Sequence, residues 1–170
     1  MRTIILFLLS VCGTIAYGQN RLSLELAPHF DFLTTGLGTN DAGAGIDIRL
    51  TRAFKEKNDL AFETGWGSFW GSKVMDAGLL DGQLNNKTHF INSLLSYEYK
   101  PFPNLYLGIG GGVSVNRLNA QWYADPLIKP SIAVNVSRKN KGLVKLYYVV
   151  VPKPGESVRY AGVSFLARIL

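Results

Sequence analysis

NLYLGIGGGVSVN, residues 104–116, places a cluster of glycines inside a run of apolar residues. A dinucleotide-binding loop would need the pattern Gly-x-Gly-x-x-Gly followed by a helix. Here Val113 stands where the third glycine belongs, and no helical pattern follows. Instead, leucine, isoleucine and valine alternate with glycine, serine and asparagine, and successive side chains of a strand point to opposite faces. The stretch therefore predicts a β-strand with one apolar face and one face on which side chains must be small.

The same alternation recurs along the chain beyond residue 19, where almost nothing has helical periodicity. The sequence contains no run of about 18 apolar residues that could cross a membrane as a helix. The run 143–151 is apolar on both faces and alternates least, and Leu94 breaks the pattern of its own run. Eight strands are predicted, at 21–32, 44–52, 59–67, 89–100, 104–116, 128–137, 143–151 and 159–170.

The first residues are typical of an export signal. Residues 4–11 are apolar, and Ala16-Tyr17-Gly18 has small residues at the two positions that a signal peptidase recognises. We expect residues 1–18 to be a cleaved signal peptide and residues 19–170 to form the barrel domain. The alternative is a buried N-terminal strand or helix.

The only cysteine, Cys12, lies within this predicted signal. A lipoprotein acylated at Cys12 is a second alternative, although Val11 stands where a small residue is needed. After cleavage at residue 18 the chain would have no disulfide, no thiolate nucleophile and no cysteine-based zinc site.

The connections between the predicted strands alternate in length. Those after the first, third and fifth strands are long, at 33–43, about 68–88 and 117–125, whereas most others are short. Such alternation places the long loops at one end of a barrel and both termini at the other, as in outer-membrane barrels with periplasmic termini. We expect the long loops to form an extracellular interaction surface that includes Trp70, Trp122 and Tyr123.

Two closed architectures fit eight antiparallel strands. In an exported, soluble, lipocalin-like barrel the apolar face would surround a hydrophobic ligand, whereas in a membrane barrel it would face lipid. The polar face consists mostly of Gly, Ala, Ser and Asn, which suit the crowded inside of a narrow barrel better than a water-exposed surface. The charges of both signs on that face would then form an interior polar network of Glu25, Asp47, Arg49, Glu63, Glu98, Lys129 and Arg168.

Aromatic residues gather near both ends of the predicted strands, as they do at the two interfaces of a membrane. The alternative is that they close the ends of a soluble core. Phe30, Phe32, Trp66, Phe69 and Trp70 lie near the long loops, and Phe54, Tyr97, Tyr99 and Phe102 lie near the short turns. The predicted fold class is all-β, an eight-stranded antiparallel up-and-down transmembrane β-barrel.

INSLLSYEYKPFPNLYLGIGGGVSVN (91–116) resembles the central hairpin of the small outer-membrane β-barrel proteins of Bacteroidetes, often labelled porin-family or PorT-like. The resemblance implies an outer-membrane location and, as partners, outer-membrane lipids and the barrel-assembly machinery. It implies no particular ligand or reaction. Gly162 and Phe165 match part of the assembly signal of such barrels, but the chain ends in Ile169-Leu170, where relatives usually have an aromatic residue.

The sequence predicts no catalytic, cofactor or metal site. His29 and Asp31 share the inward face and could form an acyl-transfer site with a serine such as Ser68, but no Gly-x-Ser-x-Gly motif is present. A histidine within an interior polar network is the simpler interpretation. The other histidine, His89, would need carboxylate partners for a metal site, and none has a recognisable spacing.

Charge and size limit the remaining functions. The formal net charge is +6, but the basic residues are scattered and their densest cluster, 137–142, looks like a turn, so we expect no nucleic-acid partner. An eight-stranded interior is usually filled by side chains, which argues against a large-pore porin. We expect a small outer-membrane barrel with a structural or surface-interaction role. A soluble carrier of a hydrophobic ligand is the second candidate, and a barrel acyltransferase is the third.

Overall fold

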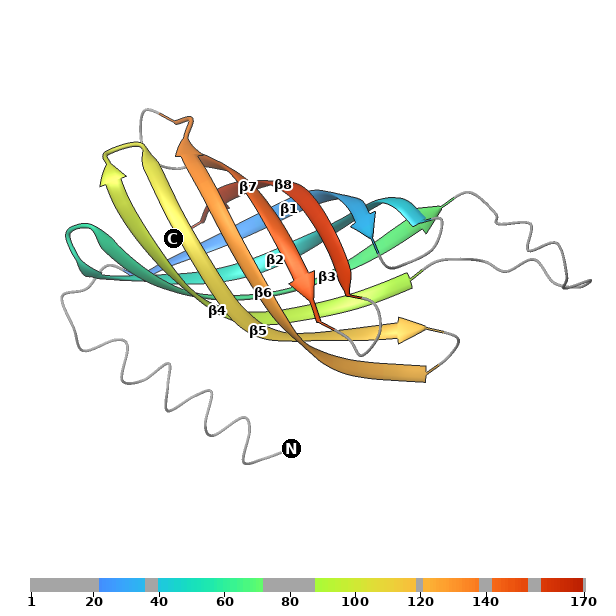
Figure 1. Cartoon of the computed structure of the whole chain (residues 1–170). Helices are drawn as coiled ribbons and strands as arrows, with labels where there is room; N and C mark the ends of the chain where they lie inside the picture. The colour runs from blue at the N-terminus through green and yellow to red at the C-terminus, as the bar shows by residue number, and fades with distance from the viewer. Residues whose placement is uncertain are drawn as a thin grey trace, which may run out of the picture.

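A computed structural model describes residues 22–35, 40–71, 88–118, 121–137, 142–152 and 157–169, so the predicted signal peptide lies outside the described residues. Each strand pairs antiparallel with its neighbour in sequence, and the last pairs with the first, which closes the barrel (Figure 1). The predicted eight-stranded up-and-down barrel is therefore confirmed. The described strands are β1 (Leu22–Thr35), β2 (Asn40–Lys55), β3 (Asn58–Gly71), β4 (Thr88–Phe102), β5 (Leu105–Leu118), β6 (Gln121–Asn135), β7 (Gly142–Val151) and β8 (Val158–Arg168).

Over the residues that the structure describes, no helix has the length and apolar character needed to cross a membrane.

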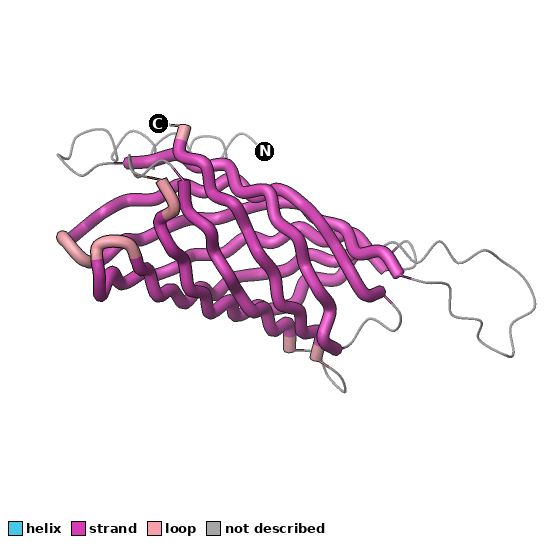
Figure 2. Tube along the Cα trace, turned by 90° about the horizontal axis from the view of Figure 1, so that it is seen from above, coloured by secondary structure: helices cyan, strands magenta, loops and turns pink. Residues whose placement is uncertain are grey.

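The barrel wall is apolar outside and polar inside. Among the outward side chains, Leu95 is 59% exposed and Ile109 is 58% exposed, whereas the inward Glu63 is only 2% exposed. The strands cross the wall obliquely (Figure 2), as closure of a sheet into a barrel requires. Because side chains alternate between the two faces of every strand, the wall is apolar outside and mostly polar inside around its whole circumference.

Two predicted long loops are wrong, because the strands on either side of them are longer than their alternation indicates. Residues 33–43 were expected to form a long connection, but β1 extends to Thr35 and β2 begins at Asn40. Residues 117–125 were expected to form a long connection, but β5 and β6 stay paired up to Leu118 and Gln121. Trp122 and Tyr123 therefore lie in β6, and Trp70 lies in β3 rather than in a loop. Aromatic residues favour strands, and a short connection lets the ladder of hydrogen bonds continue to its tip.

An apolar plug fills the interior towards the ends of β3 and β4 that lie beside their long connection. Its rings pack closely: the ring centroid of Phe69 lies 5.1 Å from that of Phe90 in a tilted arrangement and 5.1 Å from that of Tyr160 in an edge-to-face arrangement. Phe69 is 1% exposed, so its predicted place in an outer aromatic belt is wrong. Phe69 is an even number of residues from Glu63 along β3, so it points inward with Glu63, whereas Trp66 and Trp70 point outward. The plug consists of Phe69, Phe90, Leu94, Leu127, Tyr147, Val149, Val151, Val158 and Tyr160.

Glycines on the inner face provide room for large side chains from neighbouring strands. A methyl group at Gly67 would collide with the ring of Phe90, and one at Gly108 would lie 2.6 Å from the Oγ of Ser131. Gly111, by contrast, faces outward, where the nearest atom to such a methyl group is 4.0 Å away. Most glycines of 104–116, namely Gly108, Gly110 and Gly112, are therefore packing positions on the inner face of a strand, as the sequence predicts.

We expect Gly67→Ala to lower the free energy of unfolding by about 1–3 kcal/mol, because the added methyl group overpacks the plug around Phe90. The matched control is Gly111→Ala on the outer face, which should be neutral or stabilising by up to about 1 kcal/mol, since alanine restricts the unfolded chain. Urea unfolding of the refolded protein, followed by tryptophan fluorescence, measures both. Equal effects of the two changes would contradict the assignment of inner and outer faces.

Candidate functional site

Arg49 on β2 is the centre of a buried charge network inside the barrel. Its side chain is 2% exposed, and its guanidinium nitrogens lie 2.5 Å from the Oε2 of Glu25 and 2.5 Å from the Oε2 of Glu98. Its Nε lies 3.9 Å from Glu63. The planar guanidinium can serve several carboxylates at once, so Arg49 links β1, β3 and β4 through its own strand.

Two lysines complete the network from the opposite side of the barrel. Lys129 on β6 donates a hydrogen bond to Glu63 and lies 3.6 Å from Asp47. Lys145 on β7 lies 3.1 Å from Glu63 and 3.4 Å from Glu98. Glu63 and Glu98 therefore each receive cations from two sides of the barrel, and the ion pairs cross its interior.

Lys145 was missed by the sequence analysis, because it lies in the run 143–151, which is apolar on both faces. A signal for it was present. The predicted network of Glu25, Asp47, Arg49, Glu63, Glu98, Lys129 and Arg168 contains four carboxylates but three cations. Because buried charges need partners, that imbalance indicated a further cation, and Lys145 shares the inward parity of Leu143 and Val149.

The network opens to solvent at the end where β1 begins and β8 ends. Arg168, whose side chain is 36% exposed, lies 3.2 Å from the Oε1 of Glu25. Ser23 and Thr51 also donate hydrogen bonds to Glu25, at 3.3 Å and 3.5 Å. Six of the seven predicted network residues are thus buried, while Arg168 covers the cluster from the rim.

A second polar cluster connects the charge network with the apolar plug. The Nδ1 of His29 lies 2.9 Å from Asp31, and its Nε2 lies 3.5 Å from Asp47. The hydroxyl of Tyr147 donates to Asp31 at 2.5 Å. Further along, Asn92 donates to the hydroxyl of Tyr160 at 2.9 Å.

The acyl-transfer site considered from the sequence is wrong in its serine. Ser68 shares the outward parity of Trp66 and Trp70 and lies with them on the outside of the wall, whereas His29 lies inside. The Nε2 of His29, which would accept a serine proton, faces the carboxylate of Asp47 instead. This arrangement suits a fixed polar network better than a nucleophile and its base.

Seven strands contribute the charges, and β5 contributes the space that they occupy. A methyl group at Gly108 would lie 3.2 Å from the Cγ of Glu98, and one at Gly110 would collide with Leu94 and Ser96. The nearly bare face of β5 therefore allows long side chains from the other strands to meet inside a narrow barrel.

These features define an eight-stranded antiparallel β-barrel of the transmembrane type, with a charged interior and an apolar exterior. Solved structures with this fold include the outer membrane protein Ail of Yersinia pestis in a bilayer nanodisc, with a TM-score of 0.61 and 7% identity over 88% of this chain and 100% of that one. The N-terminal barrel domain of Pseudomonas aeruginosa OprF is also similar, with a TM-score of 0.54 and 14% identity over 87% and 99% of the two chains.

A de novo designed transmembrane β-barrel has a TM-score of 0.53 and 12% identity, over 86% of this chain and 95% of the designed one. At these identities the similarity establishes the fold. No protein-family model and no curated protein matches the sequence.

We expect Arg49→Ala to lower the free energy of unfolding by about 3–5 kcal/mol, because it leaves Glu25 and Glu98 buried without their main cation. Arg168→Ala is the matched control. It removes an arginine that contacts the same Glu25 from a partly exposed position, so its cost should be at most about 1 kcal/mol. Equilibrium urea unfolding in detergent micelles compares the two. Similar losses for both variants would show that the interior pairs do not carry the stability.

Proposed function

We propose that this chain is a small bacterial outer-membrane β-barrel with a structural or surface-interaction role, and that it is neither a large-pore porin nor an enzyme. The observation that carries the proposal is the polarity of the wall. Leu95, Ile109 and Phe30 are each more than half exposed on the outer face, while Arg49 and Glu63 are buried within. Such a barrel leaves a continuous apolar surface in contact with its surroundings, and hydrocarbon is the solvent that suits it.

The filled interior supports a role other than transport. The charge network joins opposite walls through Arg49, Lys129 and Lys145, and the plug around Phe69 and Phe90 fills the interior above it. An eight-stranded barrel has little more room than its own side chains need. Conduction would require several buried ion pairs to separate, each at a cost of several kcal/mol.

The resemblance of 91–116 to Bacteroidetes porin-family or PorT-like barrels is the finer part of the proposal. Together with the lengths of the connections, it would place both termini in the periplasm and the long connection at residues 72–87 outside the cell. Binding functions usually reside in loops held by a rigid scaffold. Barrel-assembly machinery would insert the chain, and lipids of the outer membrane would surround it.

The membrane location is tested by a charge on the outer face. Leu95 lies in the middle of β4, so Leu95→Arg should cost about 2–4 kcal/mol of folding free energy in a bilayer, because an arginine at mid-membrane must leave water. Val136 is a similarly exposed aliphatic residue that lies beyond the end of β6. Val136→Arg should cost at most about 1 kcal/mol, since charges near the interface reach water.

Refolding into phospholipid vesicles, with heat-dependent migration on a gel as the readout of the folded barrel, measures both variants. If Leu95→Arg is as well tolerated as Val136→Arg and the wild-type protein is removed from membranes by alkaline carbonate, the chain is a soluble barrel and the proposal is wrong.

The orientation is tested with epitope tags. A tag between Asp81 and Gly82 should be labelled on intact cells, because the proposal places residues 72–87 outside. A tag between Glu56 and Lys57, in the tight turn that joins β2 to β3, should be labelled only after the outer membrane is permeabilised. The opposite labelling pattern would reverse the proposed topology.

A further inference from the structure

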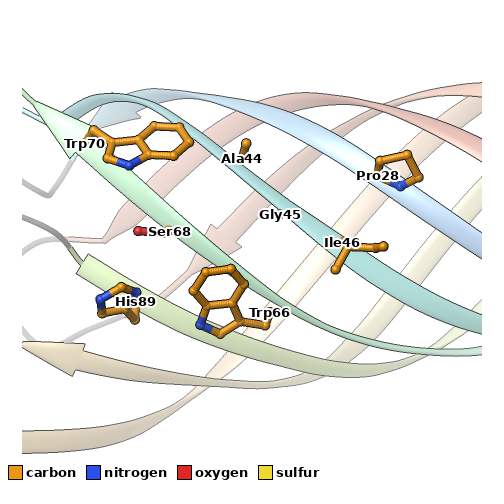
Figure 3. Close-up of a pocket in the computed structure, with 8 residues that line it drawn as sticks. All are labelled: Pro28, Ala44, Gly45, Ile46, Trp66, Ser68, Trp70 and His89. Atoms are coloured by element: carbon orange, nitrogen blue, oxygen red, sulfur yellow. The ribbon is translucent and has the colours of Figure 1, made fainter.

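The outer wall carries a groove near the ends of β3 and β4 that lie beside their long connection. Figure 3 shows its residues: Trp66, Trp70, Pro28 and Ile46 surround the smaller Ala44 and Ser68, with Gly45 beneath and His89 at one side. The groove has a volume of about 530 Å³, which is within the range of small-molecule binding sites. Its lining is almost entirely apolar.

The groove exists because small side chains interrupt a row of large ones. Ala44 pairs with Ser68, and Ser68 pairs with His89, so the three lie side by side across β2, β3 and β4. Along β3, Ser68 lies between Trp66 and Trp70, which are 51% and 44% exposed on the same face.

The strand register gives the groove a direction. Pro28 lies in the middle of β1, Ala44 is the fifth residue of β2, and His89 is the second residue of β4. Because the strands are tilted, this row runs obliquely along the wall from a deeper level at Pro28 to the rim at His89. One end of the groove is thus apolar and deep, and the other is close to the interface.

The rim end carries a polar group that has no partner among the described residues. The Nδ1 of His89 is buried and forms no hydrogen bond there, although the ring is held by stacking on Trp66, with 5.8 Å between centroids and 19° between planes. A buried polar atom without a partner is costly. His89 lines the groove with its imidazole, and an apolar groove with an imidazole at its rim end matches an amphiphile that has a hydrocarbon chain and a polar end.

We propose that the groove binds one phospholipid, with an acyl chain lying over Ala44 and Ser68 between the two tryptophans and an oxygen of its polar region accepting a hydrogen bond from the imidazole of His89. The inference rests on the proposed membrane location, and it adds a defined lipid site to an otherwise general lipid-facing surface. A narrow, flexible chain fills a fixed depression without displacing the indoles. Tryptophan also favours the depth at which chain and head group meet.

The test uses the full-length protein refolded into phosphatidylglycerol vesicles, extracted into mild detergent and analysed by native mass spectrometry. We expect the wild type to retain one phospholipid per barrel. Ala44→Trp fills the depression and should reduce the retained fraction at least tenfold. Ala124→Trp is the matched control, because Ala124 is an exposed alanine on the outward face of β6, away from the groove; it should retain lipid as the wild type does.

Two further variants keep the test decisive. Ser68→Leu fills the same depression if Ala44→Trp does not fold, and His89→Phe keeps an aromatic ring against Trp66 while removing the nitrogen, so it should weaken retention several-fold. Equal retention by the wild type and both filling variants overturns the proposal, as does a wild type that retains no lipid. A lipid-free dimer that Ala44→Trp dissociates would also overturn it, because a second copy would then occupy the groove.

Failure of the membrane location is recognised separately. A wild-type chain that alkaline carbonate removes from membranes contradicts the proposed function and the lipid site together. An inserted, heat-modifiable barrel without a retained lipid contradicts the lipid site alone.

Discussion

The structure depends on the neutralisation of charge inside a narrow, closed wall. Arg49 lies against carboxylates from β1, β3 and β4, and Lys129 and Lys145 reach Glu63 from the other side. Desolvation of these groups is expensive, and only close pairing with opposite charges offsets it. Each pair joins two strands, so the network favours one register for the whole barrel: a strand shifted by one residue would turn its charge towards the outside.

This constraint explains the bare inner face of β5. Long charged side chains need depth, and eight strands enclose little of it. Glycines at 108, 110 and 112 remove side chains from one sector of the wall, and Glu98, Ser96 and Leu94 occupy the space beside them. Glycine loses more conformational entropy on folding than any other residue. The packing and ion pairing of the neighbouring strands must offset this cost. The glycine cluster and the charge network are thus two parts of one arrangement.

The alternation of apolar and polar residues was enough to predict the strands, their number and the face of most residues. In a closed barrel, every second residue of a strand points inward and the others point outward, so the position in the alternation gives the location of the side chain. Alternation was insufficient where both faces are apolar or both are aromatic. Lys145 was missed because Leu146 and Val144 are as apolar as its inward neighbours, and Phe69 was placed outside because parity was set aside in favour of its position near a strand end. Trp122 and Tyr123 were assigned to a loop because polar neighbours interrupt the alternation at the beginning of β6. The pairing of specific charges, such as Lys129 with Glu63, required the strand order and tilt.

The interior satisfies most of its own polar groups within the described residues, and this limits where the protein can act. A network whose members already bind one another gains little from a ligand, and the plug around Phe69 separates it from the rim beside the long connections. The outer wall differs, because its depression at Ala44 and Ser68 is open and has the imidazole of His89 at its rim end. Recognition by this barrel is therefore expected on its outer surface and rim, while the interior holds the scaffold in one shape.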